Sequence, residues 1–471
     1  MQNQGSEHVT SLKDTLVMET PRVWDKIAEE DRTAVFEYAK GFRTFLNQAR
    51  TERTAVKLLV DGAKSKGFLD IEEADDQARG FYQVMRGKLL AMAVPGSLPM
   101  TEGIRLIASH TDCPRLDLKQ NPLYEDTDLA LLKTHYYGGI KKFHWVARSL
   151  AIVGTVILGD GTIIDVQIGL DAEDPIFTIP DLLPHLGKNQ MEKKANEFIP
   201  AENLNVVVGG LPYIDEGEEQ RVKLAILELL HNKYGIKEED FTTAELQIVP
   251  AEPARDSGFD RSFVAGYGQD DRVCAYTSYT AFMDITNPSH TAVTVFFDKE
   301  EIGSEGNTGA QSQFLELFLF NLMERTGIEP TSHNLHKVCH NAKALSADVN
   351  AALDPTYPDV FEKRNACKLG SGIVVEKYTG YGGKYGASDA SAEYASWIRR
   401  LFNDNNIVWQ IGGHGKVDEG GGGTVAKFLA KMGMDIIDVG PPLLGMHSPL
   451  EITAKSDVWT CHNAYKVFLE S

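Results

Sequence analysis

Five short polar motifs carry the residue types that could do chemistry, and each one follows a strand-like run or lies in a polar turn. In open α/β sheets, ligands bind beyond the carboxyl ends of the strands, so imidazoles and carboxylates gathered there predict a metal site. Two histidines and three carboxylates are an oxygen and nitrogen donor set suited to Zn²⁺, Mn²⁺ or Co²⁺ and not to a thiolate-bound metal. The motifs are His110-Thr-Asp112, Asp270-Asp271-Arg272, Asp298-Lys-Glu300-Glu301, Ser346-Ala-Asp348 and Met446-His447-Ser448.

Each motif taken alone also has a plainer interpretation. An Asp-Asp or Glu-Glu pair is usually a solvated turn, and a histidine after an apolar strand is more often a hydrogen-bonded structural residue than a ligand. The joint pattern favours the metal site, because Glu300 and Glu301 directly follow a strand predicted to be buried. Two charges at that place are costly unless something pairs them, and a pair of metal cations would do so.

The elements that must position these motifs alternate between helices and strands. Residues 291–297 form a nearly continuous apolar, β-branched run, which is typical of a buried parallel strand. Residues 314–323 are apolar on nearly all sides, which predicts a helix packed on both faces. The alternation predicts an α/β fold with a mostly parallel sheet flanked by helices. The other expected elements are helices at 34–49, 54–66 and 425–432 and strands at 104–109, 407–411 and 435–439.

The stretch from about 114 to 258 has a different sequence pattern, with strand-like runs joined by turns. Strand-like runs at 150–158 and 162–168 are joined by the turn Gly159-Asp-Gly161, and a helix at 221–233 ends at Gly235. We interpret this stretch as a separate, mainly β module inserted in the chain.

The composition of the chain limits the kinds of partner and location that we expect for it. The chain of 471 residues has 47 Lys plus Arg and 67 Asp plus Glu, and its formal net charge of −20 argues against nucleic acid. It has no run of 18 apolar residues and no basic-then-apolar start, so we expect neither a membrane span nor a secretory signal. Five scattered cysteines without a CxxC fit a reducing, cytoplasmic location.

Taken in order, the motifs resemble the aspartyl aminopeptidase family of dinuclear metallopeptidases, and the likeness covers most of the chain. A neighbouring family, the tetrahedral aminopeptidases, shares the same ligands. The segments that carry the resemblance are Thr54-Ala55, Lys66-Gly67-Phe68, Ser109-His-Thr-Asp112, Tyr137-Gly-Gly139, Gln269-Asp-Asp271, Phe297-Asp-Lys-Glu-Glu-Ile-Gly-Ser304, Ser346-Ala-Asp348 and Leu444-Gly-Met-His-Ser448.

The resemblance implies two divalent metal ions per subunit, with Zn²⁺ expected and Mn²⁺ or Co²⁺ as alternatives. It implies that His110 and Asp348 bind one ion, that Glu301 and His447 bind the other, and that Asp270 bridges the two. The reaction would be the removal of N-terminal residues from peptides by a water that the two metals activate.

The same resemblance implies further features of the site, the architecture and the assembly. Glu300 would be the general base, Asp112 would orient His110, and the peptide bond between Asp270 and Asp271 would be cis. The expected architecture is a catalytic domain of residues 1–113 and 259–471, interrupted by a dimerisation domain of residues 114–258. The expected assembly is a homo-oligomer, a tetrahedral dodecamer.

The substrate preference stays open, because Asp270-Asp271 stands where many relatives have Asp-Asn, and the segment after Gly139 also differs. Lys384, in a Gly-rich loop, would pair with an acidic N-terminal residue of the substrate, or it is a surface lysine. His185 resembles a histidine of the inserted domain that reaches a neighbouring subunit's active site, or it has no such role.

Two other functions remain at this stage. One is a different hydrolase on the same dinuclear scaffold, such as a carboxypeptidase or a deacylase. The other is a non-enzymatic assembly protein, which the intact set of His110, Asp270, Glu300, Glu301, Asp348 and His447 argues against.

Overall fold

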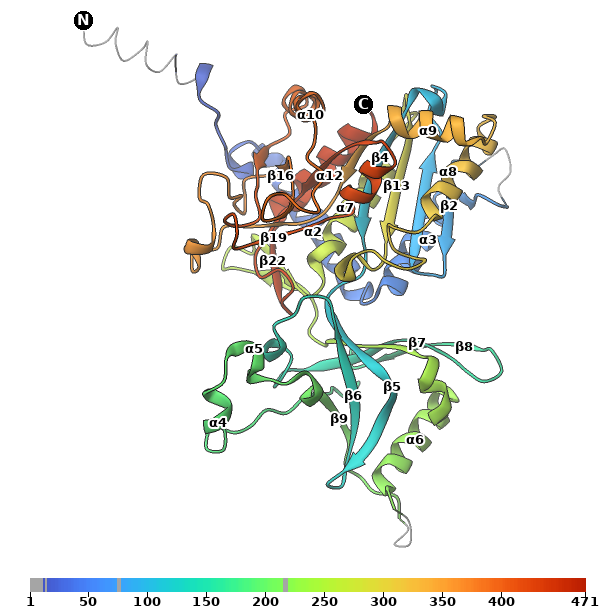
Figure 1. Ribbon diagram of the computed structural model, residues 1–471, viewed down its shortest axis with the longest axis vertical. Helices are drawn as coiled ribbons and strands as arrows, with labels where there is room; N and C mark the ends of the chain where they lie inside the picture. Colours follow the sequence, from blue (N-terminus) through green and yellow to red (C-terminus); the bar gives the residue numbers. More distant parts are fainter. Residues whose placement is uncertain (1–11, 13–14, 74–77, 215–218) are drawn as a thin grey trace, which may run out of the picture.

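The chain folds into two bodies that lie end to end along the long axis of the molecule (Figure 1). This computed structural model describes residues 12, 15–73, 78–214 and 219–471. The upper body in Figure 1 contains a nine-stranded sheet between two layers of helices, and the lower body contains a six-stranded sheet. Among the described helices, none combines the length and the apolar character that crossing a membrane requires.

The nine-stranded sheet supplies the edge at which the polar motifs meet. Its four middle strands β13, β4, β14 and β20 are mutually parallel, whereas both flanks contain antiparallel pairs. Every residue of β13 and β4 is buried, as the apolar sequence of β13 predicts. The strand order is β1 (Phe68–Asp70), β2 (Gly80–Met85), β3 (Leu89–Val94), β13 (Thr291–Phe297), β4 (Ile104–His110), β14 (Lys343–Ser346), β20 (Asp435–Gly440), β16 (Ile373–Glu376) and β18 (Trp409–Ile411).

Helices cover both faces of this sheet and bury one hydrophobic cluster on each. The larger cluster contains residues of α2 (Arg32–Gln48), α3 (Glu52–Ser65), α7 (Gln269–Asp284), α10 (Ala392–Asp404) and α12 (Lys455–Leu469). The other contains residues of α8 (Phe314–Arg325), α9 (Ser332–Asn341) and α11 (Ala426–Lys431). The predicted α/β fold is therefore confirmed, with helix and strand bounds within two residues of those expected.

The prediction for α8 was wrong in one respect. This helix buries only one face, and Leu317 on the other face is 44% exposed. Its apolar composition indicated burial all round, but composition alone does not tell which faces of a helix find a neighbour.

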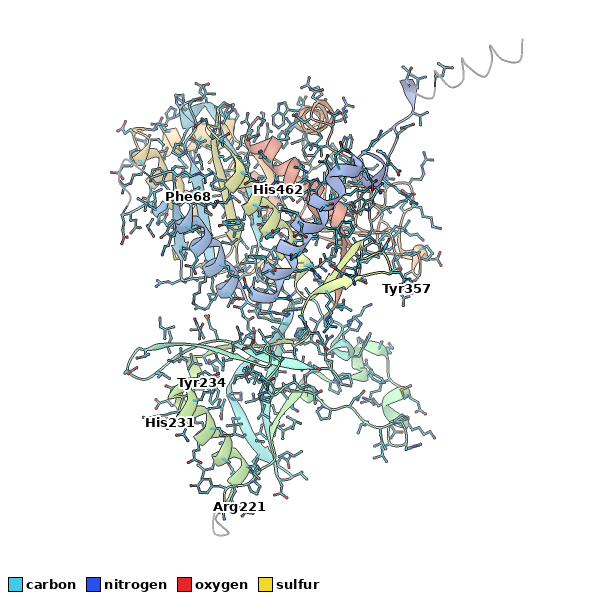
Figure 2. All side chains as sticks on the ribbon, turned by 180° about the vertical axis from the view of Figure 1, so that it is seen from behind. Phe68, Arg221, His231, Tyr234, Tyr357 and His462 are labelled. Carbon is cyan, nitrogen blue, oxygen red and sulfur yellow. The ribbon has the colours of Figure 1, made fainter. Side chains whose placement is uncertain are left out.

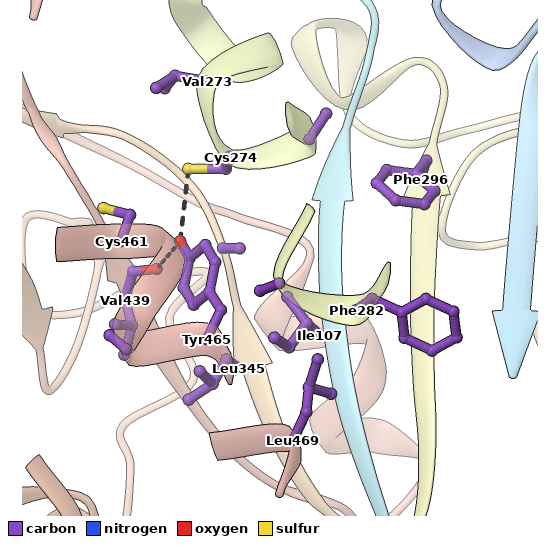
Figure 3. Close-up of a cluster of buried hydrophobic side chains, with 14 of the residues drawn as sticks. Ile107, Val273, Cys274, Phe282, Phe296, Leu345, Val439, Cys461, Tyr465 and Leu469 are labelled. Atoms are coloured by element: carbon purple, nitrogen blue, oxygen red, sulfur yellow. Dashed lines mark hydrogen bonds between the residues drawn. The ribbon is translucent and has the colours of Figure 1, made fainter. Parts of the chain in front are cut away.

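Tyr465 ties three elements of the larger cluster together (Figure 3). Its hydroxyl donates a hydrogen bond of 2.7 Å to the carbonyl of Val439 in β20 and lies 3.6 Å from the sulfur of Cys274 in α7. The contact fixes α12 against the helix that begins at the polar motif Asp270-Asp271.

We predict that Tyr465→Phe lowers the free energy of unfolding by about 1–3 kcal/mol, because the buried Val439 carbonyl loses its donor. Urea denaturation with an unchanged m-value is the measurement. Tyr357→Phe is the control, since Tyr357 is 66% exposed at the edge of the upper body (Figure 2) and should change stability by less than about 0.5 kcal/mol. An equal effect of the two changes would contradict the prediction.

The lower body is an antiparallel sheet with one long helix against it. α6 (Arg221–Tyr234) contacts β5, β6 and β9 and ends at Gly235 in the left-handed conformation that glycine favours. In Figure 2, Arg221, His231 and Tyr234 mark this helix. The strand order is β8 (Ile163–Ile168), β7 (Leu150–Ile157), β10 (Glu245–Pro250), β5 (Arg115–Asp126), β6 (Leu129–Tyr137) and β9 (Asn205–Gly209).

Short elements complete both bodies. The helices α4 (Lys188–Met191) and α5 (Ala195–Phe198) lie on the side of the lower sheet away from α6 (Figure 1). A three-stranded sheet joins β11 (Arg255–Ser257), β12 (Phe263–Gly266) and β22 (Glu451–Ala454). Two further strand pairs are β15 (Asn350–Ala351) with β21 (Pro442–Leu443) and β17 (Gly380–Tyr381) with β19 (Gly421–Gly422).

Candidate metal centre

The parallel strands bring the polar motifs to one edge of the nine-stranded sheet. His110 is the last residue of β4, and Glu300 and Glu301 begin a short 3-10 helix (Glu300–Ile302) just after β13. Asp348 follows β14, and His447 lies between β21 and β22. Since the carboxyl ends of parallel strands share an edge, distant parts of the sequence converge there.

Asp270 enters the site from the start of α7. The backbone angles of Asp270 and Asp271 are not helical, and the peptide bond between them is cis, as the resemblance implied. The backbone N–H groups of Gln269 and Asp270 both donate to the Oε2 of Glu451, which holds this turn in place.

The two carboxylate oxygens of Asp270 face different histidines. Its Oδ1 is 3.3 Å from the Nε2 of His110, and its Oδ2 is 3.2 Å from the Nε2 of His447. The Nε2 of His447 is also 3.3 Å from the Oε2 of Glu301, and that of His110 is 4.0 Å from the Oδ1 of Asp348. Two donors on one tetrahedral Zn²⁺ at about 2.0–2.1 Å would lie roughly 3.3 Å apart, so three of the four separations suit shared ions.

The electrostatics of the cluster call for cations. Burial raises the pKa of Glu301 well above its usual range and that of Asp348 to about 7. Among the described residues, nothing donates a hydrogen bond to the buried Oε1 of Glu301. An unpaired buried carboxylate oxygen is costly, and a bound divalent cation would remove that cost. The donor set therefore fits the metal that the motifs predicted.

Asp270 and the histidines behave as an already paired group. Burial acts to raise the pKa of Asp270, but hydrogen bonds from His110 and His447 outweigh it and hold that pKa below its usual range. Burial also lowers the pKa of His447, yet Asp270 and Glu301 together raise it to about 10. The Nε2 of each imidazole thus faces carboxylates, and a bound cation would replace the proton on that nitrogen.

Asp112 contacts both His110 and the turn that carries Glu300 and Glu301. Its Oδ1 accepts from the backbone N–H of Glu300 at 3.1 Å, and its Oδ2 accepts from that of Glu301 at 3.2 Å. The Nδ1 of His110 lies 3.0 Å from the backbone carbonyl oxygen of Asp112 and 3.2 Å from its Oδ1. One fully buried side chain therefore orients three groups of the centre.

Glu300 lies beside the cluster and has a different electrostatic environment. Burial raises the pKa of its carboxyl, the nearby His110 lowers it and Asp348 raises it, and together these effects bring the pKa to about 8. A carboxyl whose pKa is moved toward neutrality is suited to accept and return a proton near pH 7.

Comparison with known proteins decides the family. A family model described as aminopeptidase I zinc metalloprotease (M18) matches residues 45–469. The chain belongs to the M18 family of zinc metallo-aminopeptidases. It is 47% identical over 468 residues to a probable M18 family aminopeptidase 1 of Clostridium acetobutylicum, a match that covers 98% of this chain and 100% of that protein.

Solved structures agree with this assignment. An M18 family aminopeptidase from Thermotoga maritima superposes with a TM-score of 0.92 at 43% identity, over 96% of this chain and 99% of that one. The mApe1 dodecamer of S. cerevisiae shares the fold with a TM-score of 0.73 at 21% identity, over 91% of this chain and 95% of that one. Membership of this family supports a zinc-dependent exopeptidase that removes N-terminal residues over the carboxypeptidase, deacylase and assembly-protein alternatives.

None of the contacts described for Lys384 and His185, which are predicted to bind substrate, reaches this M18 metal cluster. Lys384 is 44% exposed, its Nζ is 2.7 Å from the Oδ2 of Asp389, and it lies over the ring of Tyr378. His185 is exposed in the lower body, three residues before α4. The substrate-binding roles of Lys384 and His185 therefore stay predictions.

Sequence reasoning gave no role to several groups that complete the M18 site. Glu451 is buried, and besides the turn at Asp270 it accepts from the backbone N–H of His447 at 3.0 Å. Asp271 groups with His110 and Asp348 as a second set of potential ligands. The Nδ1 of His414 lies 3.6 Å from the buried Glu376. The acidic doublet Asp270-Asp271 was a usable signal for Asp271, whereas nothing near Glu451 in the sequence indicates its role.

Proposed function

We propose that this M18 aminopeptidase works with two divalent ions and that Asp270 bridges them. His110 and Asp348 would hold one ion, and Glu301 and His447 would hold the other. The observation that carries this assignment is that the two carboxylate oxygens of Asp270 face different histidines, His110 at 3.3 Å and His447 at 3.2 Å. Asp271 lies next to the first pair and would be available there as a further carboxylate ligand.

Glu300 is the group to which we assign proton transfer. When bound, the ions would lower the pKa of the attacking water and polarise the scissile carbonyl. Glu300 would accept the proton of that water and pass it to the leaving amine. Its backbone is anchored through Asp112, so its main chain keeps a fixed place relative to that of Glu301. The neighbouring side chain of Glu301 stays with His447 at 3.3 Å, which supports separate roles for the two acids.

We further propose that the substrates are peptides with a free N-terminus and that Lys384 influences which N-terminal residue is preferred. The ammonium of Lys384 forms an ion pair with Asp389, which also pairs with Lys377 at 2.7 Å. An ammonium has three N–H donors, so the ion pair with Asp389 leaves donors that an acidic substrate side chain could use. A preference for Asp or Glu would then arise with the ion pair intact.

The two bodies support a domain division and an assembly. We propose a catalytic domain of residues 1–113 and 259–471 and an inserted dimerisation domain of residues 114–258. Large apolar side chains are exposed on the lower body, which favours burial against a second copy. The mApe1 relative is described as a dodecamer, and a tetrahedral dodecamer here would bring His185 near a neighbouring active site. The exposed side chains are Ile176, Leu182, Leu183, Leu186, Met191, Leu211 and Ile214.

A hydrolysis screen tests the proposed activity. Protein reconstituted with Zn²⁺, Mn²⁺ or Co²⁺ is given p-nitroanilides of Asp, Glu, Leu, Lys and Ala, each with a free and an acetylated amine. We expect cleavage of the free-amine substrates only, and loss of nearly all of the rate on chelation, because the metals activate the attacking water.

Two controls complete this screen. Restoring metal after chelation should recover the rate, which separates metal loss from denaturation. Lys384→Met should weaken cleavage of the Asp and Glu substrates relative to Leu if Lys384 recognises an acidic side chain. Equal cleavage of acetylated substrates would contradict recognition of a free N-terminus.

A further inference from the structure

Three consecutive residues at the end of β6 lie against the metal centre although they belong to the six-stranded sheet. They are Tyr137, Gly138 and Gly139, which the proposed mechanism does not use. β6 ends at Tyr137, and its partner in the antiparallel register is Arg115 on β5. We call these residues the 137–139 segment.

Tyr137 contacts the residue that orients His110. Its hydroxyl donates a hydrogen bond of 2.8 Å to the Oδ2 of Asp112, the same oxygen that accepts from the backbone of Glu301. The guanidinium of Arg115 lies 3.8 Å from the centre of the Tyr137 ring, and Asp117 holds that guanidinium at 2.7 Å. The ring is therefore held at its face by Arg115 and at its hydroxyl by Asp112.

Gly138 lies close to Glu301. A Cβ on Gly138 would be 3.3 Å from the Cβ of Glu301 and 3.4 Å from Pro114, and its φ of +72° is one that other residues rarely adopt. Glycine at this position lets the backbone of β6 approach the ligand-bearing helical turn.

Gly139 contacts the second histidine. Its carbonyl oxygen is 2.9 Å from the Nδ1 of His447, which places the ring N–H on that nitrogen. The Nε2 of His447 is then free to face Asp270 and Glu301, as the geometry of the site requires. His447 has a φ of +63°, so its backbone is strained and its orientation depends on such outside contacts.

We infer that the 137–139 segment is a positioning element through which the six-stranded body orients both halves of the metal centre. Tyr137 acts on the His110 side through Asp112, and Gly139 acts on the His447 side directly. The inserted body is thus a structural part of the metal centre as well as a surface for assembly. This inference rests on the proposed two-metal function.

Tyr137→Phe and Gly139→Ala test the inference. Partners that orient metal ligands typically contribute about 10–100-fold to metal affinity or activity, and we expect about tenfold weaker metal binding for each change. An added Cβ at Gly139 would meet the Nδ1 of His447 at 3.2 Å, which is close enough to displace the ring but leaves the backbone conformation allowed. The control is Tyr136→Phe, because Tyr136 is 43% exposed and points to the other face of the same strand.

The readouts go beyond activity. Metal affinity is measured by competition with a chromophoric chelator, and the visible absorption of the Co²⁺-loaded protein reports ligand geometry. We expect both to change in the two variants and to stay unchanged in Tyr136→Phe. At saturating metal, kcat should fall while KM stays within about twofold, since the ligands and not the substrate pocket are disturbed.

Two results would overturn the inference. One is a metal affinity and Co²⁺ spectrum identical to the unmodified protein in both variants. The other is a lower melting temperature of the metal-free variants with an unchanged spectrum, which would make the segment a packing element only. Failure of the proposed function gives a different result, because the unmodified protein itself would then bind fewer than two ions or cleave no free-amine substrate.

Discussion

Glu300→Gln is expected to reduce kcat by about 10²–10⁴-fold while leaving metal binding and folding intact. The amide keeps the shape of the side chain and cannot accept the proton of the attacking water. The backbone N–H of Glu300 still donates to Asp112, so the position of Glu301 is not disturbed. Steady-state kinetics on a free-amine p-nitroanilide, together with the metal content per chain, is the measurement.

Glu305→Gln is the matched control for this change. Glu305 is exposed a few residues further along the same loop, and its loss should alter kcat by less than about twofold. Unchanged turnover in Glu300→Gln would exclude Glu300 as the base. Loss of metal from that variant would instead mean that Glu300 acts as a ligand.

Asp270→Ala should lose the metal at both positions and, with it, all measurable activity. Each histidine has one oxygen of Asp270 as its neighbour, at 3.3 and 3.2 Å, so a single truncation removes a donor from both ions. The metal content measured after gel filtration should fall from about two ions per chain to well below one. The buried partners would also be left uncompensated, so the variant should be less stable than the metal-free protein.

Asp348→Ala is the comparison that separates bridging from simple ligation. Asp348 lies 4.0 Å from the Nε2 of His110 and is assigned to one ion only. That variant should retain about one ion per chain, held by Glu301 and His447. Two ions in Asp270→Ala would make the bridging assignment wrong.

The central sheet and the cluster at its edge could be predicted because local sequence determines them. Strand β13 is an uninterrupted apolar run, and the charges that follow it have no place in a core. The same reasoning placed His110 after the strand that is β4. Strand β14, which Asp348 follows, was not among the expected strands. Parallel pairing then brings these strand ends together without any further information.

The supporting groups could not be predicted in this way. The hydrogen bond from Tyr137 to Asp112 spans 25 positions and exists only because of how the β5–β6 pair meets the upper body. Glu451 acts on residues about 180 positions earlier in the chain. Lys384 was predicted to be either a partner for an acidic substrate residue or a surface lysine, and neither alternative included its ion pair with Asp389, five residues away. In each case the side chain type was visible, but its partner depended on tertiary structure.

The anchoring role of Asp112 has an evolutionary consequence. One carboxylate fixes the main chain of the proposed base, the main chain of a proposed ligand and the ring of His110. A substitution that moves any of these groups therefore moves the other two, and paired changes should be strongly non-additive. Evolutionary change that retunes the base would therefore also have to retune the ion beside it, a constraint that residues outside this hydrogen-bonded set do not share.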